Sequence, residues 1–172
     1  MTSTTSRMQK WPLLIAAAII LVRVLSEQLG APESINFVFG VVWLYFIVPF
    51  YFVSAIVKNG STRPYLELLR NLFVFSLTTR LMVLPTYWLA YAFQWPAVRF
   101  RLDAGGVVGE GVTALQGYLI YPVLNGLSWV PFAVIVGMIL GSAALYVRRR
   151  RMAQVTAAAE LISFALFGSR FW

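Results

Sequence analysis

Long uninterrupted runs of apolar residues dominate the pattern along the chain. Four of these runs are long enough to cross about 30 Å of hydrocarbon as helices that rise about 1.5 Å per residue. We expect membrane spans at residues 11–28, 37–57, 72–93 and 124–147. The sequence therefore predicts an all-α integral membrane protein with four transmembrane helices, formed as a single domain over residues 1–172.

The loop between the third and fourth runs, residues 96–123, has a different pattern. Apolar and basic residues alternate over 98–102, and this alternation is typical of a short strand. Gly105-Gly106 then predicts a turn, and the apolar pair at 107–108 would return along that strand. We therefore expect a small β-hairpin. The segment 116–127 is apolar enough to be a re-entrant or interfacial piece before the last span.

Lysine and arginine are distributed unequally between the two sides of the predicted membrane. Cytoplasmic flanks carry an excess of these residues in membrane proteins. One side holds only Arg99 and Arg101. The other side holds nine: Arg7, Lys10, Lys58, Arg63, Arg70, Arg148, Arg149, Arg150 and Arg151. We expect both termini in the cytoplasm, as in a bacterial inner membrane protein, with an external loop at 96–123 and a cytoplasmic tail at 148–172.

Composition supports this class of protein. The chain is 60% hydrophobic and 12% charged, with a mean hydropathy of +0.77, whereas about a quarter of the residues of a soluble domain are charged. The net charge of +8 would favour nucleic-acid binding in a soluble protein. Here the basic residues lie at membrane flanks, so we expect no nucleic-acid partner. Arg23, Glu27 and Gln28 stand where a signal peptide would have its cleavage site, so we expect the first span to be uncleaved.

The chain contains no cysteine and no histidine. Structural zinc sites, histidine-held haem, thiol redox chemistry and Ser-His-Asp triads therefore lack their residues. We predict no metal and no cofactor held by such ligands, while a bound lipid or quinone remains open because neither needs them. The missing groups also favour a protein without catalytic activity.

Two arginines fall inside predicted spans. Arg80 lies ten residues beyond Arg70, about 15 Å into the membrane at the helical rise. Arg23 lies about 18 Å beyond Trp11 by the same rise. A charged side chain at the centre of a membrane helix costs about 2.5–3.5 kcal/mol on insertion scales and normally faces the bundle interior or a wet cavity. Both arginines are therefore candidates for a site inside the bundle.

Glu27 follows Arg23 by one helical turn and can pair with it. One carboxylate cannot balance two guanidinium groups, so an anionic ligand, a lipid phosphate, a partner's carboxylate or water must complete the set. A second interpretation is that Arg80 only bonds backbone carbonyls at the Pro85 kink or stretches toward an interface. The predicted ligand, partner or lipid site consists of Arg23, Glu27, Thr79, Arg80 and Tyr87.

Two features of the last span predict packing surfaces. Ala133, Gly137 and Gly141 stand four residues apart, a spacing that lets another helix approach closely, from the same chain or another. The four arginines Arg148, Arg149, Arg150 and Arg151 end the span, and each would attract anionic lipid headgroups by about 1 kcal/mol. Beyond them we expect a C-terminal interfacial helix that lies on the membrane or on a partner.

Three functions fit these residues. The favoured one is a non-catalytic accessory subunit of a larger bacterial-type membrane complex, which packs against other membrane subunits and anionic phospholipid. The alternative is a small homo-oligomeric transporter or channel with an intramembrane arginine anion site. The third is a membrane enzyme acting on lipid phosphates, whose phosphate oxygens the arginines would hold. It lacks a convincing base.

Overall fold

The computed structural model describes residues 3–167, and the side chains within 7–159. This part of the chain is nearly all helical and contains no strand. Four helical segments in it are long and apolar enough to cross a membrane. The prediction of a helical membrane protein with four such segments is confirmed at this level.

The first and third crossings are long helices. Helix α1 runs over Ser3–Gln28 and helix α4 over Pro64–Phe93. Pro64 stands at the start of α4, where the amide hydrogen that proline lacks would have no partner in the helix. The helix therefore begins before the predicted membrane span, which starts at residue 72. It continues through Pro85 and ends at Phe93, and the next residue, Gln94, has a left-handed φ of 49°.

The second crossing is broken, where the sequence predicts one helix. It consists of α2 (Glu33–Val38), a 3-10 turn η1 (Val41–Trp43) and α3 (Leu44–Lys58). The break falls at Gly40, which is buried. A Cβ at Gly40 would lie 3.0 Å from the carbonyl oxygen of Phe37 and 3.6 Å from Nη1 of Arg23. The missing side chain thus lets the broken backbone and the Arg23 guanidinium lie close together.

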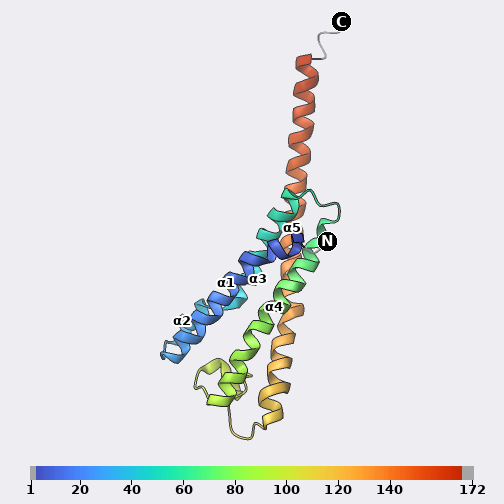
Figure 1. The fold of residues 1–172 in the computed structure, drawn as a ribbon. Helices are drawn as coiled ribbons and strands as arrows, with labels where there is room; N and C mark the ends of the chain where they lie inside the picture. Colours follow the sequence, from blue (N-terminus) through green and yellow to red (C-terminus); the bar gives the residue numbers. More distant parts are fainter. Residues whose placement is uncertain (1–2, 168–172) are drawn as a thin grey trace.

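The fourth crossing begins with a π-helical turn η4 (Gln116–Ile120), which leads directly into α5 (Tyr121–Phe167). The predicted re-entrant segment is therefore the start of this helix. At its other end α5 projects beyond the rest of the molecule (Figure 1). Residues 148–167 contain neither glycine nor proline and are rich in alanine and arginine, which favour helix. Residues 148–167 of the predicted tail therefore continue α5 without a break.

Helices α4 and α5 pack as an antiparallel pair along a row of glycines. A Cβ at Gly137 would lie 2.8 Å from Leu72, and one at Gly141 would lie 2.7 Å from Leu68. As the α5 position rises by four, the α4 position falls by four, which is the antiparallel register. We call these four residues, together with the buried Ala133, the α4–α5 seam. Their glycines face a helix of the same chain.

Aromatic side chains fill the interior between α3 and α4. The rings of Phe52 and Phe75 meet edge to face at 6.1 Å, and those of Tyr45 and Phe75 at 6.3 Å. All three are buried, and such pairs contribute about 0.5–1.5 kcal/mol beyond their buried area. Nearer the start of α1, the buried Gln9 amide donates to the backbone and side-chain oxygens of Asn71. The core thus ties α1, α3 and α4 together.

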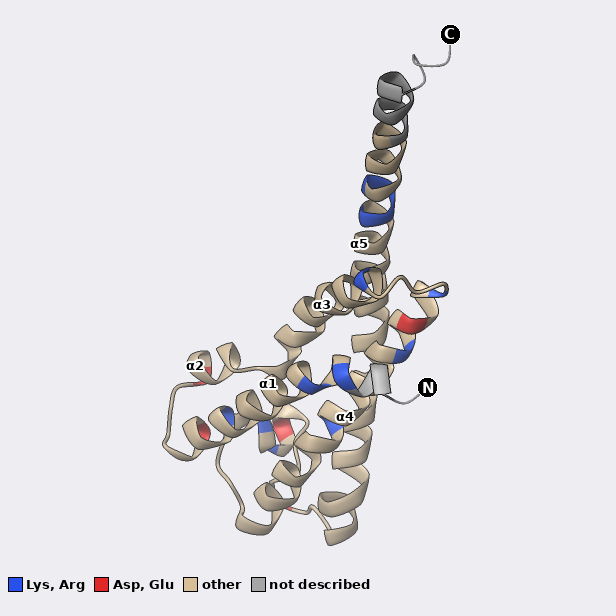
Figure 2. Cartoon of the chain, turned by 45° about the horizontal axis from the view of Figure 1, so that its top comes forward, with Lys and Arg blue, Asp and Glu red and all other residues tan. Residues whose placement is uncertain are grey.

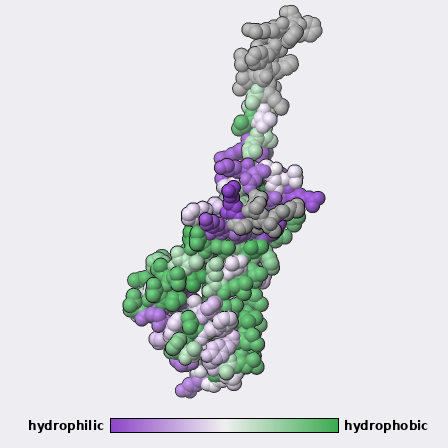
Figure 3. Space-filling model, in the orientation of Figure 1, coloured by the Kyte–Doolittle hydropathy of each residue, from purple (hydrophilic) through white to green (hydrophobic). Residues whose placement is uncertain are grey.

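The two ends of the bundle differ in charge. Lysine and arginine gather at the end where α5 leaves the bundle (Figure 2), and the hydrophilic surface at that level borders a broad hydrophobic surface (Figure 3). Arg149 and Met152 line a cavity there with the 57–64 connection. We call this the basic end. The opposite end, which carries the turn after α1 and the loop at 94–115, is the loop end.

Candidate functional site

The end of α1 and the start of α2 form one wall of a site at the loop end. The Ser26 hydroxyl donates to the side-chain oxygen of Asn36 at 2.6 Å, and the Asn36 amide donates to the Ala31 carbonyl at 3.0 Å. Asn36 is buried, so these bonds hold the turn between α1 and α2 against the bundle. They fix the last turns of α1, which carry Arg23 and Glu27.

The loop at 94–115 forms the opposite wall, and it is not the hairpin that the sequence predicts. It contains two 3-10 turns, η2 (Val98–Phe100) and η3 (Leu102–Ala104). Val107 and Val108 do return to this segment, since both amides donate to the Phe100 carbonyl at 2.7 Å. The return yields one isolated parallel bridge and no strand. The reason is Gly106, where a Cβ would lie 2.1 Å from the Phe100 carbonyl carbon; the two backbones are too close for a regular ladder.

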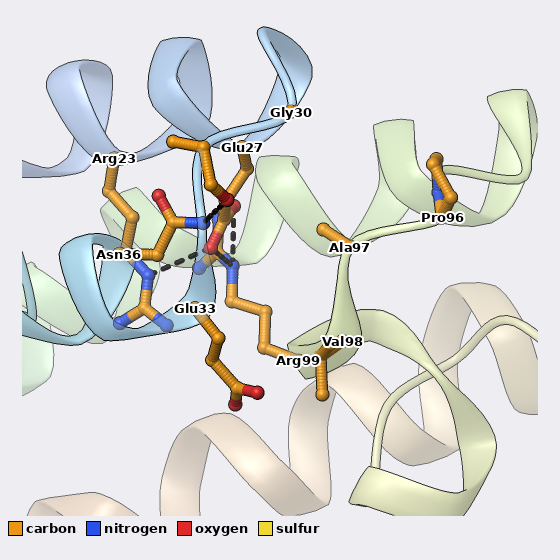
Figure 4. A pocket seen from close by; sticks show the side chains of 10 residues that line it. Arg23, Glu27, Gly30, Glu33, Asn36, Pro96, Ala97, Val98 and Arg99 are labelled. Carbon is orange, nitrogen blue, oxygen red and sulfur yellow. Dashed lines mark hydrogen bonds and ion pairs between the residues drawn. The ribbon is translucent and has the colours of Figure 1, made fainter.

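Phe100 anchors this loop. Its side chain is fully buried, and its ring meets those of Tyr87 and Trp95 at centroid distances of 5.2 and 5.7 Å. Arg99 lies beside it, with its guanidinium carbon 4.2 Å from the Phe100 ring centroid. Burial of Phe100 therefore directs the neighbouring Arg99 inward, and Figure 4 shows its side chain extending toward Glu27.

Glu27 is shared by two arginines. Nε of Arg23 lies 2.9 Å from its Oε1, and Nε of Arg99 lies 2.8 Å from Oε1 and 2.9 Å from Oε2 (Figure 4). The Glu27 side chain is 2% exposed, against 23% for Arg23 and 18% for Arg99. Burial lowers the pKa of the Arg99 guanidinium below its ordinary value, and the Glu27 carboxylate opposes that shift. The arrangement is a buried triad with one anion and two cations.

Both arginines of the triad keep donors unused. Each binds Glu27 through Nε, while a guanidinium has five N–H groups. Nη2 of Arg99 is buried and has no hydrogen-bond partner in the part of the chain that the structure describes. Since a buried donor without a partner costs about 1–3 kcal/mol, this nitrogen is ready for an acceptor that the described residues do not supply.

Arg80 stands on α4 against two aromatic rings. Its guanidinium carbon lies 4.9 Å from the Trp129 ring centroid and 5.3 Å from that of Tyr45. Cation–π contacts contribute about 0.5–2 kcal/mol each. The guanidinium thus lies on rings and not on the backbone carbonyls near Pro85. Nε of Arg80 is buried, and among the described residues it has neither a hydrogen-bond partner nor a carboxylate partner.

Two cavities adjoin these residues. The outer one, about 220 Å³, lies between the α1–α2 turn and residues 96–99 and includes Glu27 and Glu33. The inner one, about 260 Å³, is lined by Arg23, Arg80 and Arg99. Arg23 and Arg99 line both cavities and so stand at their boundary. We call the inner cavity the arginine cleft; its other lining residues are Ile20, Phe37, Gly40, Val41, Val42, Val83, Tyr87 and Trp129.

The structure distributes the predicted site residues unequally. Arg23, Arg80 and Tyr87 line the arginine cleft, and Glu27 lines the outer cavity beside it. Thr79 does not reach either cavity. It is fully buried in the core, and its hydroxyl has no hydrogen-bond partner within the described chain. Its position one residue before Arg80 places it on a different face of α4.

Sequence reasoning missed Arg99, which it assigned to an exposed external loop. The available signal was Phe100, a large aromatic residue in a glycine-rich loop, because a buried anchor fixes the direction of its neighbours. It also missed Trp129, which lies in the last predicted span, 124–147, without being singled out. Both residues come from segments far from α1 in the sequence, and their approach depends on tertiary packing.

These features define a multi-pass α-helical membrane protein with an arginine-lined cleft inside one end of its bundle. Comparisons with protein-family models, with curated proteins and with solved structures found no match to this chain.

Proposed function

We propose that this protein is a non-catalytic membrane protein that binds an anionic ligand in the arginine cleft. One observation carries the proposal: three guanidinium groups line a single cavity of about 260 Å³, and the only carboxylate that pairs with any of them among the described residues is Glu27. The excess positive charge and the unused donors of Arg80 and Arg99 both call for an anion.

Guanidinium groups inside a membrane bundle are energetically costly when no anion pairs with them. A central membrane arginine costs about 2.5–3.5 kcal/mol on insertion scales. Aromatic contacts offset part of this cost for Arg80 but accept no conventional hydrogen bond. An anion would accept several charge-assisted bonds at once, each stronger than a neutral one. The cleft is therefore an incomplete site that a ligand completes.

Binding is favoured over catalysis and over transport by one chain. Both oxygens of Glu27 already accept hydrogen bonds from arginines, so this carboxylate is not free to act on a substrate. Toward the basic end, the interior beyond the cleft is filled by Phe52, Leu72 and Phe75, all buried. A single chain therefore supplies a site that is closed toward the basic end, so the transporter alternative needs several copies or a large rearrangement.

We propose that the basic end faces the cytoplasm of a bacterial cell. The lysines and arginines at that end support this orientation, because cytoplasmic flanks are enriched in them. Both termini would then be cytoplasmic, and the arginine cleft would lie in the outer half of the membrane. An anionic ligand would reach it from the external side or from the outer leaflet.

A second candidate function is an accessory subunit of a larger membrane complex. The observation that favours it is the projecting part of α5, whose apolar residues Met152 and Val155 are 53% and 69% exposed. A partner helix or anionic lipid at Arg148–Arg151 would cover this segment. Deletion of 152–172 should release a co-purifying subunit in mild detergent and leave anion binding intact. Recovery of the same particle from both proteins would argue against this role.

Anion binding is tested on the full chain in phosphatidylcholine nanodiscs, with dodecyl phosphate, dodecanoate and uncharged dodecanol as probes. We expect both anions to raise the unfolding temperature, because a ligand that binds only the folded state stabilises it, and dodecanol to have no such effect. Arg80→Met should weaken anion binding by about tenfold or more, the scale of one charge-assisted hydrogen bond.

The matched control is Arg101→Met. Arg101 belongs to the loop that carries Arg99, but its side chain is 55% exposed, it pairs with Asp103 and it lines neither cavity. It should bind both anions like the wild type. Equal affinity of Arg80→Met and Arg101→Met for both anions would refute the proposed function. Unfolding of the ligand-free Arg80→Met protein shows separately that it folds.

A further inference from the structure

The arginine cleft carries more positive charge than a simple monoanion would neutralise. Arg23, Arg80 and Arg99 contribute three charges, and Glu27 removes one. Glu33 lines only the outer cavity; it is exposed and points away from the ion pairs in Figure 4. None of the remaining residues that line the cleft is an acid or a base of the Asp, Glu, Lys or Arg type. Two positive charges are thus left over.

We infer that the ligand of this cleft is a dianionic phosphate monoester, carried as the head group of an amphiphile whose apolar chain leaves past Phe37 and Trp129. This inference rests on the proposed function, because it specifies the anion that the site binds. The identity of the ligand follows from three properties of the cleft. These are its charge, the three arginines that supply its donors, and its size and rim.

The charge matches a phosphate monoester. Such a group carries about −1.5 to −2 charges near pH 7, because its second pKa is about 6. A carboxylate or a phosphate diester carries one negative charge and would leave one guanidinium without a counter-charge. In a site with little water, that difference is costly. The two excess charges of the cleft therefore select a dianion.

The donors match its shape. The three guanidiniums come from three separate segments: Arg23 from α1, Arg80 from α4 and Arg99 from the loop. A phosphate monoester presents three terminal oxygens in different directions, and each can accept from one guanidinium. A carboxylate has two oxygens in one plane and suits a single bidentate fork. Three arginines from separate segments that line one cavity thus favour a tetrahedral oxyanion.

The size and rim of the cleft indicate a head group and not a whole ligand. Pockets that enclose a drug-sized molecule measure about 300–1,000 Å³, and the cleft measures about 260 Å³. Its rim includes Phe37 and Trp129, which are 58% and 40% exposed. These apolar residues belong to membrane-spanning segments, where lipid chains are the solvent. A chain attached to the phosphate has an apolar exit there.

The apolar exit also separates two sources of phosphate. Free phosphate ions would enter from the polar outer cavity, past Arg23 and Arg99, and would gain nothing from an aromatic rim. An amphiphile gains affinity from its phosphate in the cleft and also from each CH₂ that it buries against the aromatic rim. The shared chemistry is the phosphate dianion, and the chain is what identifies the lipid source.

The test compares ligands that differ in one feature each. Binding to the full chain in phosphatidylcholine nanodiscs is measured at pH 8 and pH 5 for dodecyl phosphate, its methyl diester and inorganic phosphate. At pH 8 we expect dodecyl phosphate to bind about tenfold or more tighter than the diester, the scale of one added charge-assisted bond. At pH 5 the monoester becomes a monoanion, and its affinity should fall to that of the diester. The diester has a constant charge and controls for changes in the protein.

Each outcome has a distinct meaning. Equal affinity for the monoester and the diester at pH 8 overturns the inference. If Arg80→Met then binds both ligands more weakly than the wild type, the proposed function still holds. Absence of any effect of Arg80→Met with either ligand overturns both. Equal affinity for inorganic phosphate and dodecyl phosphate overturns the conclusion that the ligand is an amphiphile and assigns the cleft to soluble phosphate. Trp129→Ala, which removes part of the rim, should weaken dodecyl phosphate and spare inorganic phosphate.

Discussion

The α4–α5 seam and the arginine cleft use the same helix in opposite ways. At the seam, Leu68 and Leu72 of α4 lie against Gly141 and Gly137, so closely that a Cβ on either glycine would overlap them. At the cleft, Arg80 of the same helix faces a cavity, with a buried nitrogen that no described residue satisfies. One contact is complete within the chain, and the other is not.

This difference teaches where function resides in a small membrane bundle. Lipid is as apolar as the side chains, so the hydrophobic effect does not drive helices together in a membrane. Helices there gain instead from close van der Waals contact. A seam of glycines therefore provides stability and needs no partner. Polar groups inside the same bundle are costly, so they persist only where something balances them. Changes at the seam should thus affect unfolding, and changes at the cleft should affect ligand affinity.

The largest expected effect is at the seam. Gly137→Leu combined with Gly141→Leu would force bulky side chains into Leu72 and Leu68, and overpacking costs about 1–3 kcal/mol per site. Unfolding in mixed micelles should occur at a markedly lower denaturant concentration. The matched control is Gly126→Leu on the same helix, where a Cβ would meet nothing within 4 Å. Equal destabilisation by the control would show that the seam is not a tight contact.

Glu27→Gln should change both the stability of the fold and the affinity for an anion. Glu27 stabilises the fold and also offsets positive charge in the cleft. The substitution removes the anion shared by Arg23 and Arg99, and hydrogen bonds to charged groups contribute about 1.5–3 kcal/mol. Stability without ligand should fall by an amount on that scale, while dodecyl phosphate affinity rises because the cleft gains a positive charge. Glu33→Gln is the control and should change neither quantity. Loss of affinity in Glu27→Gln would mean that Glu27 positions the arginines.

Gly106→Ala tests how far the loop's own packing matters to the cleft. Its Cβ would lie 2.1 Å from the Phe100 backbone, so the loop must shift, at a cost of about 1–3 kcal/mol. Because Phe100 directs Arg99, anion affinity should fall as well, and amide exchange over 94–115 should accelerate. Gly111→Ala strains a left-handed residue (φ 79°) but meets no neighbour; it should cost about 1 kcal/mol and keep the affinity. Wild-type affinity in Gly106→Ala would uncouple the loop from the site.

The smallest effect should come from the exposed ion pair. Arg101 and Asp103 are 2.7 Å apart, with side chains 55% and 66% exposed, and such pairs contribute less than about 1 kcal/mol. Arg101→Ala should therefore leave the unfolding transition nearly unchanged, whereas Arg99→Ala on the same loop should lower both stability and affinity. A large effect of Arg101→Ala would contradict the distinction drawn between buried and exposed arginines.

The helical class and four apolar segments could be predicted because membrane length imposes a simple requirement on the sequence. The structure of the loop could not be predicted, because alternation of apolar and basic residues over 98–102 occurs in strands and also in other extended segments. Close packing of Gly106 against Phe100 decided between them. Four arginines mark where a span leaves the membrane, but nothing in them breaks a helix, so α5 continues through 148–167.

The candidate site was predicted in part. Arg23, Glu27 and Arg80 were singled out because charge in an apolar run is costly, and this argument needs no tertiary structure. Arg99 carries no such signal in a polar loop, and only the burial of Phe100 brings it inside. Thr79 was grouped with Arg80 by its place in the sequence, although adjacent helical residues face different directions.

The sharing of Glu27 by a helix and a loop has a mechanical consequence. Among the described residues, every ion pair that joins the 94–115 loop to α1 passes through that single carboxylate. A ligand that draws Arg99 away from Glu27 removes the ion pair between this loop and the first helix. Binding inside the bundle would then loosen the loop on its outer surface.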